Sequence, residues 1–404
     1  MRAGWEAKLL GEVCSFLNRG ISPRYLDSGG ICILNQRCIR DHRIGFEMSR
    51  RHDVRAKKVG PDRYIQTGDV LVNSTGTGTL GRVAQVRDHP SEPTTVDSHV
   101  TIVRPIRGKF YPDFFGYMLV TIEDAIKEAG EGCGGQTELP RSALAERFSV
   151  RYPESLSEQQ RIVGILNEAF DGIATAKANA GKNYQNARAL FEGGLHILFT
   201  QGGEGWLEKT IEEVCVIGDG NHSSNYPTKE DLVELGVPFI RATNLVAGRI
   251  SDSEMRYLSP QKHVQLKKGH LKTGDILITN RGEIGKTAIV DETHNNANLN
   301  SQIAWLRCRD EMDNKFLFHV LNSGEIQKEF QSSKSGAALQ QFTITQLKAL
   351  SVPVPPKHEQ RSIAAKLDCL QQRTERLESI YRQKLAALEE LKKSLLHEAF
   401  TGAL

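Results

Sequence analysis

The sequence predicts an α+β protein in which two similar mixed α/β globular domains are separated by two long helices that form an antiparallel coiled coil. Three observations lead to this fold. The chain repeats itself, each copy ends in a long helical pattern, and short β-type runs bounded by Gly, Asn and Pro fill the rest. These patterns divide the chain into a globular domain (1–156), a helix (157–203), a second globular domain (204–357) and a second helix (358–404).

The repeat is visible at both ends of each copy. Five residues near the start recur 201 positions later: Trp5, Lys8, Glu12, Val13 and Cys14 return as Trp206, Lys209, Glu213, Val214 and Cys215. Near the end, Leu195-His196 returns as Leu396-His397. Two copies of this length are too few and too large for a solenoid. We interpret the chain as one ancestral unit duplicated, which predicts a pseudo-two-fold molecule with two similar but non-identical surfaces.

Matching β-type runs support the duplication. They lie at residues 70–72 and 100–103 in the first copy and at 276–278 and 303–306 in the second. A Thr-Gly-Asp sequence enters the first run of each copy, at 67–69 and 273–275. The strand framework is therefore expected to be common to both domains.

A proline precedes each long helical pattern, at Pro153 and at Pro355-Pro356, where a helix can begin but cannot extend backwards. The first helix opens with Ser157-Glu158-Gln159-Gln160, which fits a capping box, and the second with Glu359-Gln360-Arg361. The predicted seam of the first helix is Ile162, Leu166, Ala169, Ile173, Ala176, Ala180, Asn183, Ala187 and Leu190. The predicted seam of the second is Ile363, Leu367, Leu370, Thr374, Leu377, Tyr381, Lys384, Leu388, Leu391 and Leu395.

The first helix also holds five glycines, each costing about 1 kcal/mol relative to Ala, so we expect it to need its partner helix. These glycines are Gly164, Gly172, Gly181, Gly193 and Gly194. Both patterns are long enough for rods of roughly 60 Å. The alternative is that each amphipathic helix packs only on its own domain. Length, seam and matched placement favour the antiparallel pair.

Composition sets broad limits. The chain has a net charge of +3, 39% hydrophobic and 25% charged residues, and no apolar run of 18 residues or signal-like start. Its seven cysteines contain no Cys-x-x-Cys pair, which argues against a disulfide framework and structural zinc. We expect a cytoplasmic protein without a membrane segment.

Two glycine-rich loops resemble nucleotide-binding motifs but lack the required context. Residues 76–81 spell G-x-G-x-x-G, yet residues 82–86 read as a strand, whereas a dinucleotide site needs a helix there. Residues 281–287 end in Gly-Lys-Thr and are also followed by a β-type run. Both loops are predicted to be hairpins. With no His-Glu-x-x-His, Gly-x-Ser-x-Gly or metal-ligand cluster, the chain is expected to have no catalytic residue, no metal and no cofactor of its own.

Positive charge gathers at corresponding places in the two copies. Residues 37–63 hold nine Lys/Arg against four acidic residues, and residues 241–272 hold seven against two. Two such excesses suit phosphate contact. The alternative is a solvated charged surface without a partner.

Loops at matching places carry Arg, Asn, Gln, Ser and Thr, the residue types that read base edges, but their residues differ between copies. Similar scaffolds with different loops imply two different half-sites and hence an asymmetric, split DNA target. The residues predicted to contact DNA are Asn18, Arg19, Ser22, Arg24, Asn35, Gln36, Arg37, Ser74, Thr75, Thr77, Arg82, Gln136, Asn221, His222, Ser223, Ser224, Arg241, Thr243, Asn244, Asn280, Arg281, Lys286, Gln340 and Gln341.

Taken in order, these segments resemble the specificity (S) subunit of type I restriction–modification systems over the whole chain. The resemblance is carried by residues 20–25, residues 240–245, the Thr-Gly-Asp strand entries, and the helix starts at 158–162 and 359–363. It implies that each globular domain is a target recognition domain for half of a bipartite double-stranded DNA sequence. It also implies that the helices set the separation of the halves and dock two DNA methyltransferase (modification) subunits.

The resemblance further implies that the methyltransferase partners bring S-adenosylmethionine and that restriction subunits bring ATP and Mg, so this chain is the reader and not the enzyme. Two alternatives stay open. One is a specificity subunit of a related system whose methyltransferase and nuclease are fused. The other is a coiled-coil scaffold with two protein- or RNA-binding domains, which predicts indifference to DNA sequence.

Overall fold

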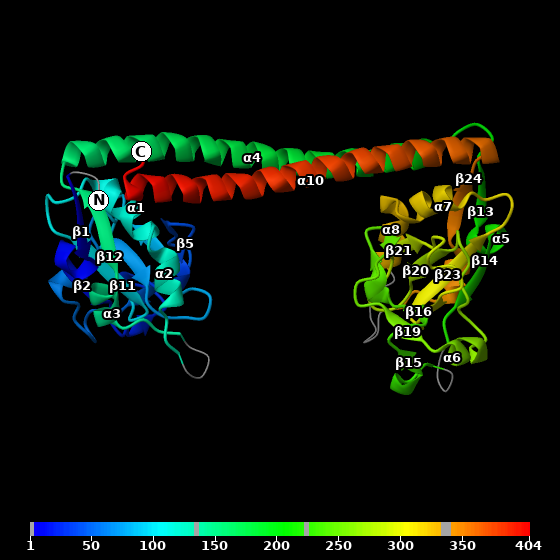
Figure 1. The fold of residues 1–404 in the computed structure, drawn as a ribbon, viewed down its shortest axis with the longest axis horizontal. Helices are drawn as coiled ribbons and strands as arrows, with labels where there is room; N and C mark the ends of the chain where they lie inside the picture. The colour runs from blue at the N-terminus through cyan, green and yellow to red at the C-terminus, as the bar shows by residue number, and fades with distance from the viewer. Residues whose placement is uncertain (1–3, 133–136, 222–225, 333–340) are drawn as a thin grey trace. The chain divides into compact units, whose positions relative to one another are not determined.

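The computed structural model describes residues 4–132, 137–221, 226–332 and 341–404. The chain forms two compact units, one made of Met1–Asn179 with Lys384–Leu404 and the other of Ala180–Gln383. Each unit holds one globular domain and a stretch of each of two long helices (Figure 1). The predicted α+β class is confirmed.

The first domain is built on two four-stranded sheets and two small two-stranded ones. One sheet has the order β2 (Cys14–Arg19), β11 (Val100–Pro105), β8 (Val70–Asn73), β9 (Val83–Gln85) and is antiparallel throughout. The other has the order β10 (Thr94–Val96), β4 (Ile31–Leu34), β7 (Arg50–His52), β3 (Tyr25–Leu26), with β10 and β4 parallel. The two-stranded sheets pair β1 (Trp5–Leu9) with β12 (Ser149–Pro153) and β5 (Ile39–Arg40) with β6 (Arg43–Ile44). Helices α1 (Pro112–Val120), α2 (Glu123–Glu128) and α3 (Arg141–Glu146) complete the domain, together with short 3-10 turns such as η2 (Gln36–Cys38).

The second domain repeats every sheet of the first. Its antiparallel sheet has the order β14 (Cys215–Asp219), β23 (Ile303–Cys308), β20 (Ile276–Thr279), β21 (Thr287–Ile289). Its mixed sheet has the order β22 (Asn298–Leu299), β16 (Val237–Ile240), β19 (Arg256–Leu258), β15 (Leu232–Val233). The small sheets pair β13 (Leu207–Thr210) with β24 (Ser351–Val354) and β17 (Leu245–Val246) with β18 (Arg249–Ile250). The helices are α5 (Ile211–Val214), α6 (Pro260–Gln265), α7 (Asn314–Leu321), α8 (Gly324–Ser332) and α9 (Ile344–Ala349). The predicted duplication is thus confirmed at the level of strand order.

The two Thr-Gly-Asp sequences form tight turns before the central strands, and the aspartate of each is buried. Gly68 and Gly274 adopt φ values of +94° and +90°, which glycine tolerates without steric cost. The aspartate that follows is 1% exposed and closes the turn, since Oδ2 of Asp69 accepts from Gln66 N and that of Asp275 from Lys272 N, both at 2.8 Å. A bidentate arginine satisfies the rest of each carboxylate, Arg104 for Asp69 and Arg307 for Asp275. The motif therefore fixes where the central strands β8 and β20 begin.

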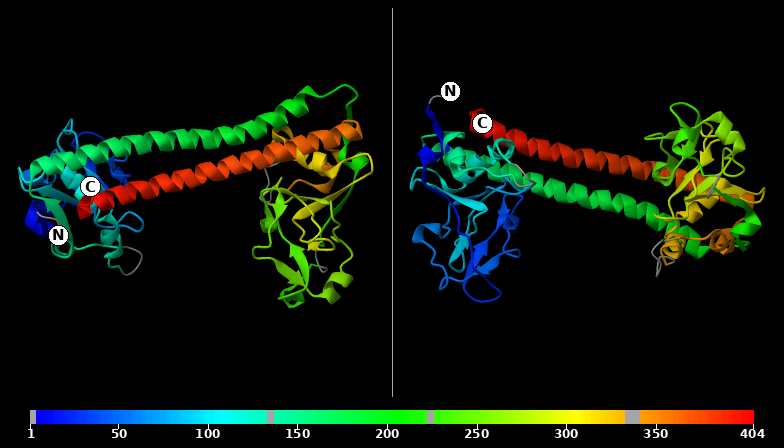
Figure 2. Two further views of the ribbon diagram at one scale, coloured as in Figure 1. Left: turned by 45° about the horizontal axis from the view of Figure 1, so that its top comes forward. Right: turned by 90° about the horizontal axis from the view of Figure 1, so that it is seen from below.

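Each unit contains an antiparallel stretch of the long helices α4 (Leu156–Gln201) and α10 (Lys357–Thr401), as predicted (Figure 2). In the first unit, Arg161 donates to the carbonyl of Leu404 at 3.0 Å, and Lys177 pairs with Glu389. In the second unit, Arg188 lies 3.9 Å from Glu378. The helices also pack on the globular domain of the unit that contains them, as where Phe400 of α10 lies 4.9 Å from Phe114 of α1 in the first domain, measured between ring centroids.

One of the two predicted seam rows is wrong over part of its length. The row that contains Leu166, Ile173, Ala180 and Ala187 is buried, as is Leu367 in α10. The second row is buried at Ile162 and Ile363, near the helix starts, but farther along Leu190, Leu377 and Leu391 are 62%, 38% and 47% exposed. Lys384, which also belongs to that row, is exposed. Phe170 and Phe191, each one position after a residue of that row, instead make edge contacts with Tyr117 and His319 of the domains.

The glycine-rich loops are hairpin connections, as predicted. Gly76, Gly78 and Gly81 all have positive φ, and the strand β9 follows the first loop where a dinucleotide site would need a helix. In the second domain β21 follows in the same way. Over the described part of the chain, no helix has the length and apolar character needed to cross a membrane.

Candidate nucleic-acid interface

The two domains place a polar cluster on one shared backbone framework where the central strands β8 and β20 end. The amide of Ser74 donates to the carbonyl of His99 at 2.9 Å, and the amide of Asn280 donates to that of Gln302 at the same distance. The chain enters this corner in the same way, since Asp97 N bonds to Leu34 O and Asn300 N to Ile240 O, again at 2.9 Å. The ends of β8 and β20 therefore share the same backbone hydrogen bonds, as their sheets share the same strand order.

Two further contacts repeat. The side chain Oδ1 of Asp97 accepts from His99 N at 2.9 Å, and Oδ1 of Asn300 accepts from Gln302 N at 3.2 Å. A returning segment then pairs with the second residue after each strand, linking Thr75 to Glu138 and Arg281 to Gln341. We call these the five framework positions. They are Ser74, Thr75, Asp97, His99 and Glu138 in the first domain and Asn280, Arg281, Asn300, Gln302 and Gln341 in the second.

In the first domain the framework side chains are bonded to one another and to neighbours. Thr75 Oγ1 lies 2.6 Å from His99 Nδ1, Ser74 Oγ lies 2.5 Å from Thr101 Oγ1, and Glu138 pairs with Arg19 at 2.6 Å. Burial raises the pKa of Asp97, and the hydrogen bond from the His99 backbone opposes that shift. The exposed His99 imidazole and the half-exposed Glu138 carboxylate are the groups most open to a ligand.

In the second domain the same positions carry amides and an arginine. Asn300 donates to Gln302 Oε1 at 3.0 Å, while Gln302 itself is exposed. Oδ1 of Asn280 and Nε of Arg281 are buried and have no hydrogen-bond partner in the described part of the chain. Unsatisfied buried polar groups are costly, and in native proteins they point to a missing ligand or a functional site.

Half of the framework was missed by sequence reasoning. Ser74, Thr75, Asn280, Arg281 and Gln341 were predicted, whereas Asp97, His99, Asn300, Gln302 and Glu138 were not. The signal was present, because Asp97-Ser98-His99 precedes the strand β11 as Asn300-Ser301-Gln302 precedes β23. Aligning the two copies through these strands would have shown matched polar positions with different residues.

Several other predicted residues of the first domain already have partners inside it. Asn35 caps η2 by accepting from Arg37 N and also donates to Met48 O, so its amide is used by the fold. Asn18 accepts from Arg141 at 2.9 Å, Arg82 donates to Gly78 O, and Gln36 Oε1 accepts from Thr79. Ser22, Arg24, Arg37 and Thr77 lie at the surface, and Gln136 lies outside the described residues.

The second domain shows a similar division. Asn244 is fully buried. It accepts from Arg241 N and donates to Ser251 O and Ser253 O, so its side chain holds the local turn together, as that of Asn35 does in the first domain. Asn221 is buried and donates to Lys268 O. Of the remaining predicted residues, Arg241 donates to Glu254 O, Lys286 pairs with Glu283, and Thr243 is exposed. Four others lie outside the described residues: His222, Ser223, Ser224 and Gln340.

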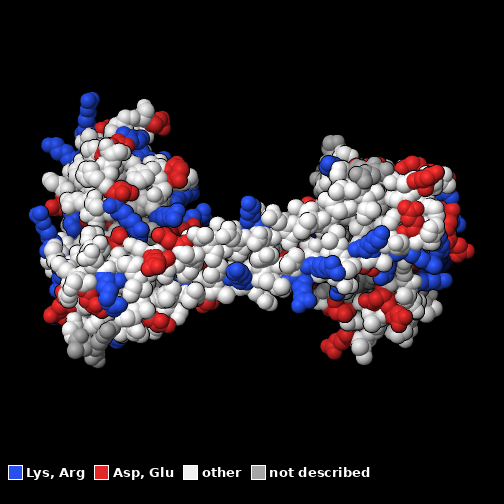
Figure 3. Space-filling view, turned by 90° about the horizontal axis from the view of Figure 1, so that it is seen from above, with Lys and Arg blue, Asp and Glu red and all other residues white. Residues whose placement is uncertain are grey.

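A cavity adjoins the first framework. It has a volume of about 450 Å³ and is lined by Tyr25, Gln36, Asp97 and His99 among others. Arg50 covers the Tyr25 ring at 3.6 Å from its centroid, so a cation and an aromatic face border the cavity together. Figure 3 shows Lys and Arg side chains distributed among Asp and Glu over both globular domains. Basic and aromatic groups beside a polar cluster suit a nucleic-acid ligand.

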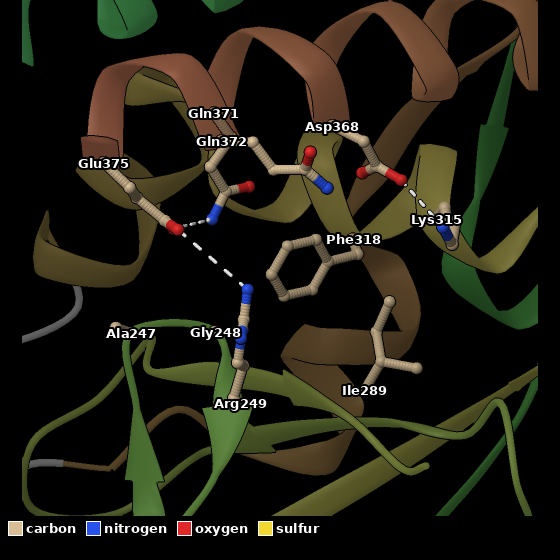
Figure 4. A pocket seen from close by; sticks show the side chains of 10 residues that line it. All are labelled: Ala247, Gly248, Arg249, Ile289, Lys315, Phe318, Asp368, Gln371, Gln372 and Glu375. Atoms are coloured by element: carbon tan, nitrogen blue, oxygen red, sulfur yellow. Dashed lines mark hydrogen bonds and ion pairs between the residues drawn. The ribbon is translucent and has the colours of Figure 1, made fainter. Parts of the chain in front are cut away.

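A second cavity, of about 210 Å³, belongs to the joint between the second domain and α10 (Figure 4). Arg249 points from β18 toward Glu375 of α10 at 3.9 Å, and Lys315 of α7 pairs with Asp368 at 2.7 Å. Its charged side chains thus face carboxylates of the same unit. Arg249, in the basic stretch expected to contact phosphate, faces Glu375 but remains 78% exposed.

The corresponding contact of the first unit joins two uncharged side chains, although Arg87 and Asp113 lie beside it. There Tyr117 of α1 donates to Asn167 of α4 at 2.5 Å, whereas in the second unit His319 of α7 lies 2.8 Å from Asp368 of α10. His319 is fully buried, and burial lowers its pKa against the opposing effect of Asp368. Burial acts to raise the pKa of Asp368, but hydrogen bonds from Lys315 and His319 outweigh it, and the pKa is lowered. The two joints therefore respond differently to pH.

Comparison with known proteins bears on this architecture. Residues 203–389 match the family model of the type I restriction modification DNA specificity domain. The putative type I restriction enzyme MjaX specificity subunit of Methanocaldococcus jannaschii is 22% identical, with 98% of this chain and 93% of that protein covered. The type I restriction enzyme EcoBI specificity subunit of Escherichia coli is 27% identical over 43% of this chain and 37% of its own length.

Two solved structures share the fold. One is a chain from work on complex assembly and conformational transition of the type I R-M system, with a TM-score of 0.82, 20% identity and coverage of 100% of this chain and 99% of the other. The second is the HsdS subunit of Thermoanaerobacter tengcongensis, with a TM-score of 0.63, 22% identity and coverage of 100% and 98%.

Two duplicated domains, each attached to the paired helices, are thus found together with matches to type I specificity subunits. The chain is similar to these specificity subunits over nearly its whole length, and the resemblance predicted from its sequence is confirmed.

Proposed function

We propose that this chain is the non-catalytic, DNA-reading subunit of a type I restriction–modification complex and that its two domains read the two halves of an asymmetric bipartite target. The observation that carries the proposal is the shared framework. One set of backbone bonds presents five different side chains in each domain, from Ser74/Asn280 to Glu138/Gln341. A reader with one scaffold and two sets of base-contacting groups needs this arrangement.

The basic stretches fit the second requirement of DNA binding, which is attachment to phosphate. In the second domain Lys267 and Lys272 are exposed, and in the first Arg55, Lys57 and Lys58 are exposed. Such contacts fix register without sequence information and make binding salt-dependent. We assign these residues to phosphate and the framework positions to base edges.

The outward row of the long helices supports a protein partner. In the second unit, Leu190 of α4 and Leu377 and Ile380 of α10 leave apolar side chains at 62%, 38% and 47% exposure on otherwise polar helix surfaces. Exposed apolar side chains on a helix suit a hydrophobic partner surface. We assign this row to docking of methyltransferase subunits, which would supply S-adenosylmethionine, while restriction subunits would supply ATP and Mg. The complex would act in the cytoplasm, where its DNA lies.

The experiment is co-expression of the chain with the methyltransferase of its own system, followed by mapping of modified bases in host DNA. The proposal predicts one bipartite, asymmetric motif with a fixed spacer. Binding of partners without any DNA sequence preference would favour the scaffold alternative. Modification by a single fused methyltransferase–nuclease partner would point to the related system.

A further inference from the structure

We propose that Arg281 is a specificity-determining residue that reads a guanine in the half-site of the second domain. The inference rests on the proposed function and goes beyond it by assigning one base type to one side chain. It starts from the contrast at a single framework position, where the second domain has Arg281 and the first has Thr75.

The backbone of Arg281 is held on both sides. It lies two positions after the end of β20 and is bridged to Gln341. The N–H and C=O of the preceding Asn280 bond to Gln302 and Phe342 at 2.9 Å. Gly282 then turns the chain with a φ of +77°. A side chain mounted on a fixed strand end is better placed for base reading than one on a free loop.

The guanidinium of Arg281 is available. Among the described residues it makes no ion pair or hydrogen bond, and its Nε is buried without a partner. The nearest carboxylate in sequence, Glu283, is paired with Lys286. Two other arginines of the second domain differ, since Arg307 is bonded to Asp275 and Arg241 to Glu254 O. Arg281 therefore keeps its terminal donors for a ligand while its stem stays recessed in the domain.

The chemistry of that ligand follows from the shape of the donor. An arginine fork offers two parallel N–H donors, and in the major groove only guanine presents two adjacent acceptors, O6 and N7, on one base. The four amide positions around it, Asn280, Asn300, Gln302 and Gln341, carry no carboxylate that would compete for the fork. A phosphate would also accept from arginine, so the test separates a base contact from a phosphate contact.

The first domain excludes the same contact at its equivalent position. Thr75 is 8% exposed and its hydroxyl is bonded to His99, so no donor fork reaches outward there. The substitution Arg281→Thr therefore installs the residue that the other copy uses on the same backbone. The control is Arg256→Thr, which removes an exposed arginine of the same domain that lies on β19, outside the framework.

The test maps modified sites with the methyltransferase partner for the unchanged chain, Arg281→Thr, Arg281→Lys and Arg256→Thr. We expect a guanine in the second half-site and loss of about tenfold or more in discrimination at that one position in Arg281→Thr. Arg281→Lys should keep part of the discrimination, because lysine also reaches guanine O6 and N7 but lacks the planar fork. The first half-site and spacer should stay unchanged in every variant, which also shows that the variant folds. Equal weakening across all sequences in Arg281→Thr would assign a phosphate contact and overturn the inference.

A measurement on the unchanged protein keeps the inference testable if the variants fail to fold. In duplexes carrying 7-deazaguanine, the second half-site guanine lacks the N7 acceptor, and the complex should bind that duplex several-fold more weakly. Unaltered affinity would overturn the inference. The absence of any bipartite motif in the unchanged complex would instead reject the proposed function, and a bipartite motif without guanine in its second half would reject only this inference.

Discussion

Gln159 and Gln360 occupy the same position in the two copies and make the same hydrogen bonds in their own units. Gln159 accepts from the amide of Tyr111 at 2.8 Å and donates to the carbonyl of Pro153 at 2.9 Å. Gln360 accepts from the amide of Asp313 at 2.7 Å and donates to the carbonyl of Pro355 at 2.8 Å. Both side chains are fully buried, so each long helix is tied at its start to the helix that covers the antiparallel sheet of its domain.

Loss of the hydrogen bonds made by Gln159 should destabilise the first unit. In Gln159→Leu the Tyr111 amide and the Pro153 carbonyl lose their partner inside the protein, which should cost about 2 to 4 kcal/mol. Gln160 is exposed beside it, so Gln160→Leu serves as the control and should change stability by less than about 0.5 kcal/mol. Denaturant unfolding of both variants measures the difference. Equal stability of Gln159→Leu and Gln160→Leu would show that the Gln159 hydrogen bonds are not energetically important.

The glycines of α4 should be replaceable with a gain. A Cβ added at Gly164 or Gly172 meets no atom within 4 Å, so Gly→Ala at each should stabilise the helix by about 1 kcal/mol. At Gly194 the added Cβ would lie 2.9 Å from Leu370 Cδ2, which requires that side chain to move. Thermal unfolding should therefore rise for Gly164→Ala and Gly172→Ala and rise less, or fall, for Gly194→Ala. A uniform response at the three sites would contradict this packing.

Acid should weaken the second joint more than the first. The pKa of buried His319 is lowered in the folded protein, so the unfolded chain binds more protons below pH ~6.5 and stability falls as pH decreases through that range. The lowered pKa of Asp368 adds a further loss in the same direction at lower pH. Hydrogen exchange between pH 7 and 5 should show the contacts of α7 opening before those of α1.

The double substitution His319→Tyr with Asp368→Asn copies the neutral Tyr117–Asn167 pair of the first unit. It should abolish most of the pH dependence in the second joint. Persistence of the full dependence in this variant would place its origin in other groups.

The outward leucines should matter to assembly and not to folding. A charge at Leu190 or Leu377 removes apolar surface that the fold leaves exposed, so Leu190→Asp and Leu377→Asp should weaken methyltransferase binding by tenfold or more with little change in unfolding. Asn186→Asp adds the same charge at an exposed polar position of α4 and is the control. Calorimetric titration with the partner measures the effect. Wild-type affinity in both leucine variants would move the docking surface elsewhere.

Sequence periodicity was sufficient for the duplication, the central strands and the existence of the two helices. Periodicity did not predict which side of each helix faces inward, since the leucines at 190, 377 and 391 fit the heptad pattern although they are exposed. Contacts of Phe170 and Phe191 with the domains decide which row faces inward, and these contacts are tertiary. Residue type likewise suggested Asn35 and Asn244 as base readers, whereas both are local caps, a common role of asparagine beside a turn.

The central claim is that the five framework positions decide which half-site each domain reads. Its most direct test gives the second domain the five residues of the first, by Asn280→Ser, Arg281→Thr, Asn300→Asp, Gln302→His and Gln341→Glu, and maps the modified motif with the methyltransferase partner. We predict a changed second half-site with an unchanged first half-site and spacer. An unchanged motif, or a change in the first half-site, would contradict it.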